Sequence, residues 1–252
     1  MRTARRGGLT GVVAATLLVA AALPAAAAPG DGSAYGASVS ITLLGLGPIT
    51  AGPFAAASTD GPTENSLATA NVPNVLSVGL INTSARLDET TGQVDSRASA
   101  ADVVIGVLGP VNTIRATLVE ATCTATQSGN SGATRLVDLE LGTLGSVSAT
   151  PAPNTRIDVP GVASITFNEQ IANDDGSLTV NAIHVRLLGG TSSALGSGDV
   201  IVSSATCGPA ALPIPMASGV GLWLGLGALA LAAVPTALAV VRRRPSGTAV
   251  AA

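Results

Sequence analysis

The chain has no lysine, very few aromatic residues and a single histidine, His184. Aromatic residues make up only 2% of the sequence and charged residues 11%. Without lysine, the chain cannot form a Lys-based isopeptide bond, a Schiff base or a pilin-type Lys linkage. Because so few aromatic rings are present, little is available to stack on a sugar, and valine, isoleucine and leucine have to fill the core.

Charge is distributed unevenly along the chain. All fifteen acidic residues lie between Asp31 and Asp199, together with only six of the twelve basic residues, all of which are arginine. Six positive charges against fifteen negative ones give this segment a net charge of about −9, which the whole-chain value of −3 conceals. Such a surface repels phosphate, so nucleic acid and anionic lipid are poor partners for it.

The N-terminus has the pattern of a secretory signal peptide. Arginines in the first six residues precede a short apolar core, Leu9–Leu23, and Ala25–Ala28 offers an A-x-A cleavage site. The apolar core is too short for a membrane span and has the flanks of a signal peptide, so we predict one over residues 1–27. The Arg5–Arg6 pair leaves twin-arginine export as a less favoured alternative.

The C-terminal part combines prolines, an uncharged apolar run and a cluster of arginines. The run Met216–Val241 contains Trp223 and exceeds the roughly 20 apolar residues that cross a bilayer core as a helix. The arginines follow at once, as Arg242, Arg243 and Arg244. Because positive charge prefers the cytoplasmic side, we predict a transmembrane helix over 216–241, a cytoplasmic tail over 242–252 and an extracellular domain before them.

The prolines ahead of the predicted helix leave two fates open for the tail. Leu212, Pro213 and Pro215 stand where wall-anchored proteins carry an L-P-x-T-G sorting motif, within a Pro-rich spacer over 209–215. Pro215 replaces the threonine of that motif and Met216 replaces the glycine. We therefore favour retention as a membrane anchor, with cleavage and cell-wall linkage as the alternative.

Alternation of apolar and polar residues dominates the segment between these ends, residues 29–208. Val39–Leu43, Val137–Leu141 and Ile183–Leu187 each place their apolar residues on one face. The Asp175–Gly176 pair between apolar runs is a strong hairpin signal. No stretch shows convincing helical periodicity. We predict an all-β, sandwich-like domain of about eight to ten strands.

Further strands are expected wherever apolar runs lie between turn signals. These ranges are Val75–Leu87, Gln93–Ala98, Ile114–Thr124, Ile165–Ile171, Leu178–Leu188 and Val200–Thr206.

The two cysteines, Cys123 and Cys207, both lie in the predicted extracellular part. An even pair in an oxidising compartment predicts one disulfide. It would close a loop of about 85 residues and contribute on the order of 4 kcal/mol in the chain-entropy model. A metal site is disfavoured, because the chain has no C-x-x-C motif and only one histidine.

Two segments of the domain have matching length and landmarks. Gly92–Cys123 and Gly176–Cys207 each open with a hairpin glycine and end in Ala-Thr-Cys, and Ala98 and Ala182 occupy equivalent places. We predict an internally duplicated hairpin-plus-strand unit. The bridge would then join equivalent strand ends of two related halves.

No catalytic group emerges from the sequence. Alternation places His184 on an exposed strand face beside Arg186, which indicates a solvated surface histidine, and no G-x-S-x-G elbow occurs. Paired carboxylates are explained by turns or polar strand faces; the pairs considered are Asp88/Glu89, Asp138/Glu140 and Asp174/Asp175. We predict that the chain is not an enzyme and holds no cofactor.

Two alternatives to a purely structural role stay open. The acidic turns, such as Asn173–Gly176, favour a ligand-binding module for calcium or glycan, although the loop lacks the ligand spacing of an EF-hand. A secreted hydrolase is less favoured, since it rests only on His184 and scattered carboxylates.

Three features together resemble one family: the opening Ala34–Gly45, the two strands ending in Ala-Thr-Cys, and the proline, helix and arginine order of the tail. The chain resembles the choice-of-anchor surface proteins of high-GC Gram-positive bacteria, closest to the P type, over most of Gly32–Arg244. The resemblance implies a surface-displayed β domain without an assigned activity or catalytic residues. We therefore expect a structural or adhesive protein of the cell membrane and cell surface, whose partners are the membrane and envelope or extracellular ligands.

Overall fold

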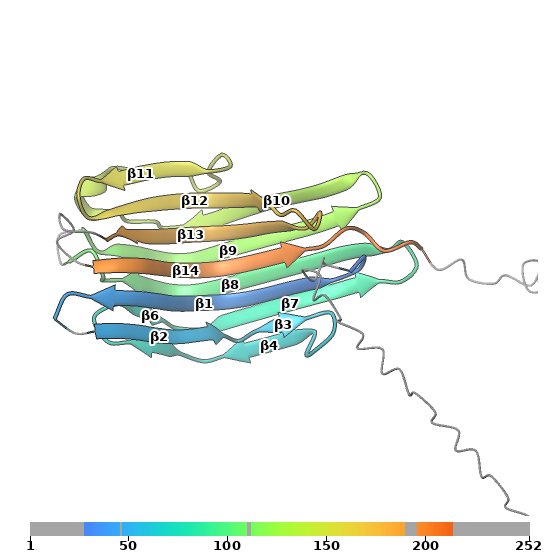
Figure 1. Cartoon of the computed structure of the whole chain (residues 1–252), viewed down its shortest axis with the longest axis horizontal. Helices are drawn as coiled ribbons and strands as arrows, with labels where there is room; N and C mark the ends of the chain where they lie inside the picture. Colours follow the sequence, from blue (N-terminus) through green and yellow to red (C-terminus); the bar gives the residue numbers. More distant parts are fainter. Residues whose placement is uncertain (1–27, 46, 110–111, 190–195, 214–252) are drawn as a thin grey trace, which may run out of the picture.

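A computed structural model describes residues 28–45, 47–109, 112–189 and 196–213, which form two antiparallel sheets stacked face to face (Figure 1). The predicted all-β, sandwich-like architecture is confirmed, but the described residues form fourteen strands and not the eight to ten expected, because several are short edge segments such as β3 and β5. The predicted signal peptide, the helix over 216–241 with Trp223, and the arginine cluster lie outside the described residues. Within the part that is described, no helix is both long and apolar enough to span a membrane.

One sheet, sheet A, has the strand order β11-β12-β13-β14-β1-β2, and β3 also pairs with β1. Its strands are β1 (Gly32–Leu43), β2 (Gly47–Phe54), β3 (Ala57–Ser58), β11 (Thr155–Val159), β12 (Ala163–Ala172), β13 (Leu178–Leu188) and β14 (Gly196–Cys207).

The other sheet, sheet B, has the order β10-β9-β8-β6-β5, while β7 also pairs with β8 and β4 lies beside β7. Its strands are β4 (Glu64–Leu67), β5 (Ala70–Val72), β6 (Leu76–Val78), β7 (Ile81–Asp88), β8 (Gln93–Ile105), β9 (Ile114–Thr126) and β10 (Gly129–Val137). A short 3-10 turn, η2 (Gly142–Leu144), follows β10. The alternating run Val137–Leu141 was expected to be a strand, but β10 ends at Val137 and only an isolated bridge joins Glu140 to Arg115.

The core lies between the sheets and is built almost wholly from aliphatic side chains. Phe167 is its one large aromatic ring and is fully buried, among isoleucines such as Ile81, Ile105 and Ile165. Each such side chain contributes about 1.5–3 kcal/mol through its removal from water. The scarcity of aromatic residues is thus met by many small apolar contacts.

The strand ends define two ends of the sandwich. At the terminal end, Gly32 and Leu178 both pair with Cys207. At the far end, Leu43 pairs with Gly196. The described chain begins and finishes at the terminal end.

In several strands of sheet A, the alternation of inward and outward side chains slips by one residue. The residues at which it slips lie side by side in a row across the sheet. The residues of this row are Gly36, Asn154, Asn168, Ala182 and Ser203. Three of them have left-handed backbone, with φ of 58° for Asn154, 50° for Asn168 and 55° for Ser203. A Cβ at Gly36 would overlap the side chain of Ile81 in sheet B. The row is therefore a place of close approach between the sheets, and beyond it the outward-facing positions shift by one residue.

Candidate functional site

The predicted disulfide is present and joins β9 of sheet B to β14 of sheet A through the core. Cys123 and Cys207 are both buried, with their Cα atoms 5.6 Å apart. A glycine stands opposite each cysteine on a neighbouring strand: Gly132 faces Cys123 and Gly32 faces Cys207. A Cβ at Gly132 would overlap the side chain of Val180, and a Cβ at Gly32 would overlap Val94 and Ser96, so both glycines allow the two sheets to approach closely beside the bridged strands.

The bridge joins equivalent positions of the two matching segments. One segment forms the β8–β9 hairpin of sheet B, and the other forms the β13–β14 hairpin of sheet A. A second equivalent pair also meets, because the Ser203 hydroxyl donates a hydrogen bond to the Val119 carbonyl oxygen at 2.8 Å. Contact between like positions of two units is typical of a twofold relation between them.

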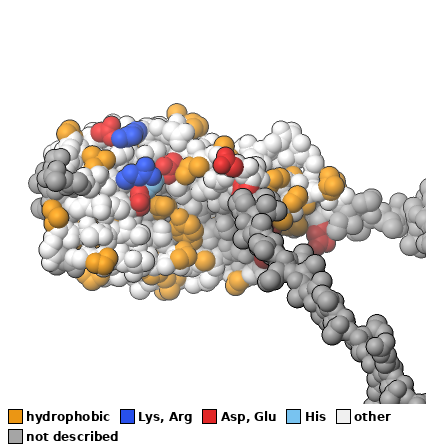
Figure 2. All heavy atoms as spheres, in the orientation of Figure 1, with side chains coloured by type: hydrophobic (Ala, Val, Ile, Leu, Met, Phe, Trp, Pro, Cys, Tyr) orange, Lys and Arg blue, Asp and Glu red, His pale blue; other side chains and the backbone are white. Residues whose placement is uncertain are grey.

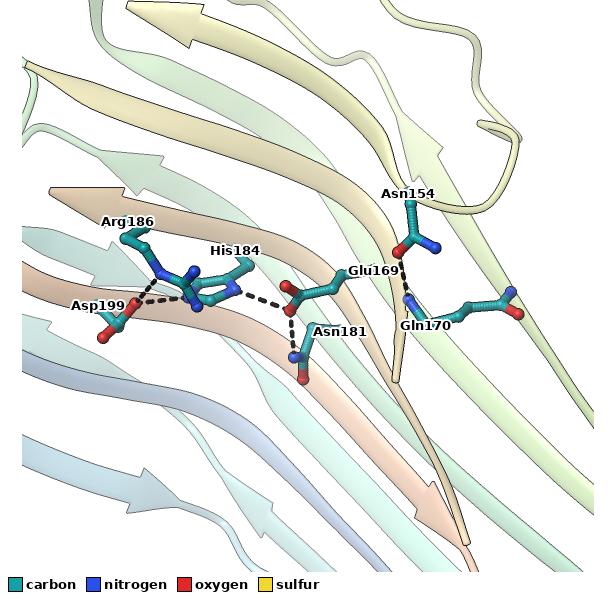
Figure 3. Close-up of polar contacts among 7 residues, drawn as sticks. All are labelled: Asn154, Glu169, Gln170, Asn181, His184, Arg186 and Asp199. Atoms are coloured by element: carbon teal, nitrogen blue, oxygen red, sulfur yellow. Dashed lines mark hydrogen bonds and ion pairs between the residues drawn. The ribbon is translucent and has the colours of Figure 1, made fainter. Parts of the chain in front are cut away.

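His184 is buried rather than solvated, which corrects the interpretation of it as a surface histidine. It lies on the outer face of sheet A as the alternation predicts, but its side chain is only 7% exposed. Charged side chains on this face are few and stand in small groups (Figure 2). The side chains of Glu169 from β12 and Asp199 from β14 enclose the ring of His184 from both sides, as Figure 3 shows.

Both ring nitrogens of His184 meet a carboxylate. Nδ1 lies 2.7 Å from Glu169 Oε2, and Nε2 lies 2.8 Å from Asp199 Oδ1. The Asn181 amide donates to the same Glu169 oxygen at 2.7 Å, and Arg186 Nε donates to Asp199 Oδ1 at 3.1 Å. The cluster therefore ties β12, β13 and β14 together across the outer face of the sheet.

The electrostatics of the cluster favour a charged histidine beside charged carboxylates. Burial lowers the pKa of His184, but the hydrogen bonds and negative charges of Glu169 and Asp199 outweigh it and raise the pKa above its ordinary 6.5. Burial likewise raises the pKa of Glu169, but hydrogen bonds from His184 and Asn181 lower it below its ordinary 4.5. Each partner thus stabilises the ionised form of the other.

This arrangement is poorly suited to catalysis. A general base or a nucleophilic imidazole needs a nitrogen lone pair, and a charged ring that donates from both nitrogens has none. The same holds for metal ligation, which needs neutral imidazole. The cluster is arranged to fasten strands.

One member of each carboxylate pair noted in the sequence accepts hydrogen bonds from neighbouring side chains or backbone. The Thr91 hydroxyl and the Thr90 N–H lower the pKa of Asp88 in its turn. Asp138 accepts a hydrogen bond from the Thr117 hydroxyl at 3.0 Å. Asp175 accepts two from Ser177, so the hairpin explains the acidic turn at Asn173–Gly176. Among the described residues, no group of histidine, cysteine and acidic side chains is placed to hold a metal ion.

A polar hollow of about 680 Å³ lies on the outer face of sheet B, over β4, β7 and β8. Hydroxyl, amide and charged groups line it, among them Ser66, Asn82, Ser84 and Arg97. Arg97 also pairs with Glu120 at 2.5 Å. The sequence offered no signal for this hollow, because its lining comes from three separate strands whose outward side chains meet only in the folded sheet.

A scan against protein-family models and searches of curated proteins and of solved structures gave no match to this chain.

Proposed function

We propose that the chain is an exported protein of the cell surface, whose β sandwich has a structural or adhesive role at the envelope. The observation that carries the proposal is that the described domain begins and finishes side by side. The Gly30 N–H donates to the Pro209 carbonyl oxygen at 2.8 Å, and the Gly208 N–H donates to the Asp31 carbonyl oxygen at 2.7 Å. A leader before this domain and an anchor after it would thus both attach at the terminal end.

The end of the described chain supports the same orientation. The Ala211 N–H donates to the Gly92 carbonyl oxygen at 2.8 Å, and Gln127 Nε2 donates to the Ala211 carbonyl oxygen at 2.6 Å. Leu212, the first residue of the candidate sorting motif, is 82% exposed just beyond this attachment. A predicted membrane helix over 216–241 would hold the terminal end near the bilayer and point the far end away from it.

Charge differs between the two ends in a way that suits this orientation. The acidic residues in or beside the terminal-end turns are Asp31, Asp60, Asp88, Glu89, Asp174 and Asp175. The described far-end turns at 44–45, 106–109 and 160–162 contain no charged residue themselves, although Asp158 lies beside one of them and Glu140 bridges to Arg115 near the ends of β8 and β9. An acidic base is repelled by anionic lipid, so the domain would stand off the membrane while its far end meets partners.

The proposal also includes an internal duplication of the β domain. Two contacts between equivalent positions, Cys123 with Cys207 and Val119 with Ser203, support an internal duplication of the hairpin unit. A surface-displayed β domain of this kind is what the resemblance to choice-of-anchor proteins implies. The proposal includes no catalytic role, because the single histidine has both nitrogens engaged.

The test is to fractionate cells that express the native chain and to determine both ends of the mature protein by mass spectrometry. A mature N-terminus near residue 28, with Ala252 present in the membrane fraction, is the expected result. A C-terminus near Leu212–Met216 in the wall fraction would favour the cell-wall alternative. An intact Met1 in the cytosol would overturn surface display altogether.

The polar hollow on sheet B favours a second candidate, a glycan-binding module. Its hydroxyl and amide groups suit the hydroxyls of a neutral sugar, although no aromatic ring is among its lining residues. Neutral wall polysaccharide should then raise the melting temperature of the wild-type protein but not that of Asn82→Ala. A melting temperature unmoved by such ligands removes this candidate and leaves the structural role untouched.

A further inference from the structure

We propose that the cluster around His184 is a pH-sensitive latch. While the histidine is charged, the latch fastens β12, β13 and β14 of sheet A; when the histidine is neutral, it releases its β14 side. The inference rests on the geometry of the cluster and does not depend on where the protein is located.

The latch is closed only when the ring of His184 contacts both carboxylates, and this requires a protonated ring. A neutral imidazole has one N–H, so it can donate to Glu169 or to Asp199 but not to both. The remaining carboxylate then faces a nitrogen lone pair, and the contact becomes repulsive. Only the imidazolium form satisfies both distances of 2.7 and 2.8 Å.

The surroundings decide which contact is lost. The Glu169 side chain is 15% exposed and is also held by the Asn181 amide. The Asp199 side chain is 43% exposed, and its other partner, Arg186, is 61% exposed. Because water solvates Asp199 much better than Glu169, the neutral ring keeps its proton on Nδ1 toward Glu169. The latch therefore opens at β14.

Few other charges can influence the ring. Arg186 is on its own strand, β13, and contacts Asp199. On β11, Arg156 is separated from His184 by Thr166 of β12 and pairs with Asp158 at 2.7 Å. The partners of Asp199 on β1 are uncharged, with Ser40 directly opposite. The titration of His184 thus reports mainly on Glu169 and Asp199.

The sign of the pH dependence follows from the two shifts. The pKa of His184 is raised in the fold, so its contribution is complete below 6.5 and is lost as the pH rises through the raised value. The pKa of Glu169 is lowered, so its contribution is complete above 4.5 and is lost only at more acidic pH. The latch is closed in mildly acidic solution and opens as the pH rises through the raised pKa of His184.

Hydrogen exchange measured by mass spectrometry on the full chain in detergent micelles tests the latch. Between pH 6 and pH 9, peptides containing Arg186 or Asp199 should lose protection, after correction for intrinsic exchange rates, while sheet B peptides serve as the internal reference. The loss should be about tenfold for each unit by which the folded pKa of His184 exceeds 6.5.

Variants separate the latch from general pH effects. His184→Gln should abolish the step, and Asp199→Asn should reduce it to the part that Glu169 alone supports; Asp199→Asn also covers the case in which His184→Gln does not fold. Asp158→Asn, which removes an exposed ion pair of the same sheet, should keep the wild-type step. A step of wild-type size in Asp199→Asn, or no step in the wild type, would overturn the proposal.

Discussion

The disulfide and the histidine cluster fasten the same hairpin, β13–β14, in two different ways. The bridge ties its Cys207 end to sheet B through the core, whereas the cluster ties Asp199 to β12 across the outer face. The bridge is covalent and insensitive to protons over the ordinary pH range. The cluster depends on one proton. The comparison shows that one hairpin combines a permanent fastening at its terminal end with a conditional one toward its far end.

Removing the bridge should have the largest effect. Replacing Cys123 and Cys207 together by alanine should lower the free energy of unfolding by on the order of 4 kcal/mol, because the unfolded chain regains the entropy of a long loop. Denaturant unfolding of the oxidised wild type and of the double variant measures this. The loss should be equal at pH 6 and pH 9; a strongly pH-dependent loss would contradict a separate role for the bridge.

Crowding the core between β10 and β13 should cost less. In Gly132→Ala, the new Cβ overlaps the side chain of Val180, so we expect a loss of about 1–3 kcal/mol from overpacking. The matched control is Gly61→Ala, where the nearest atom, Ser58 Oγ, would lie 3.3 Å away. Equal melting temperatures for the two variants would show that the glycine opposite the cysteine is not needed for packing.

Neutralising one side of the histidine cluster should have a smaller, pH-dependent effect. Glu169→Gln keeps the shape of the side chain but removes its charge, so we expect a loss of about 1–2 kcal/mol at pH 6. At pH 9 the loss should shrink, because the neutral ring gains little from a carboxylate. Urea unfolding at the two pH values measures the difference, and a loss that grows with pH would reverse the assigned sign.

Breaking the exposed ion pair on β11 should have the smallest effect on the free energy of unfolding. Arg156 and Asp158 are 57% and 60% exposed, so water and salt screen their contact. Asp158→Asn should change the free energy of unfolding by less than about 0.5 kcal/mol at either pH. A larger loss would mean that charge on this face acts beyond the histidine cluster.

The sequence could predict the bridge but not the cluster, for physical reasons. Two cysteines in a chain with a predicted signal peptide have one simple pairing, and their matching places in two segments of similar sequence strengthen that prediction. His184 was placed on the correct face, but alternation does not say what covers a side chain there. Glu169 lies fifteen residues before His184 and Asp199 fifteen residues after it. That equal spacing is the one feature of the sequence that links the three residues.

The reversal of alternation at Asn168 concealed the first of these partners. Ile165 and Phe167 face the core, and an unbroken alternation would place Glu169 there too. The left-handed backbone at Asn168 turns Glu169 outward instead, and local sequence patterns do not announce such a change. The expected strand Val75–Leu87 shows a similar limit, because it divides into β6 and β7 where Gly79 and Leu80 bond to Ala101.

The most direct measurement is an NMR titration of the full chain with its only histidine isotopically labelled, so that a single ring signal reports on His184. The account predicts a pKa above 6.5 in the folded protein, and a return toward 6.5 in Glu169→Gln. A folded pKa at or below 6.5 would mean that burial outweighs the two carboxylates. It would contradict the claim that a charged His184 holds β12 and β14 together.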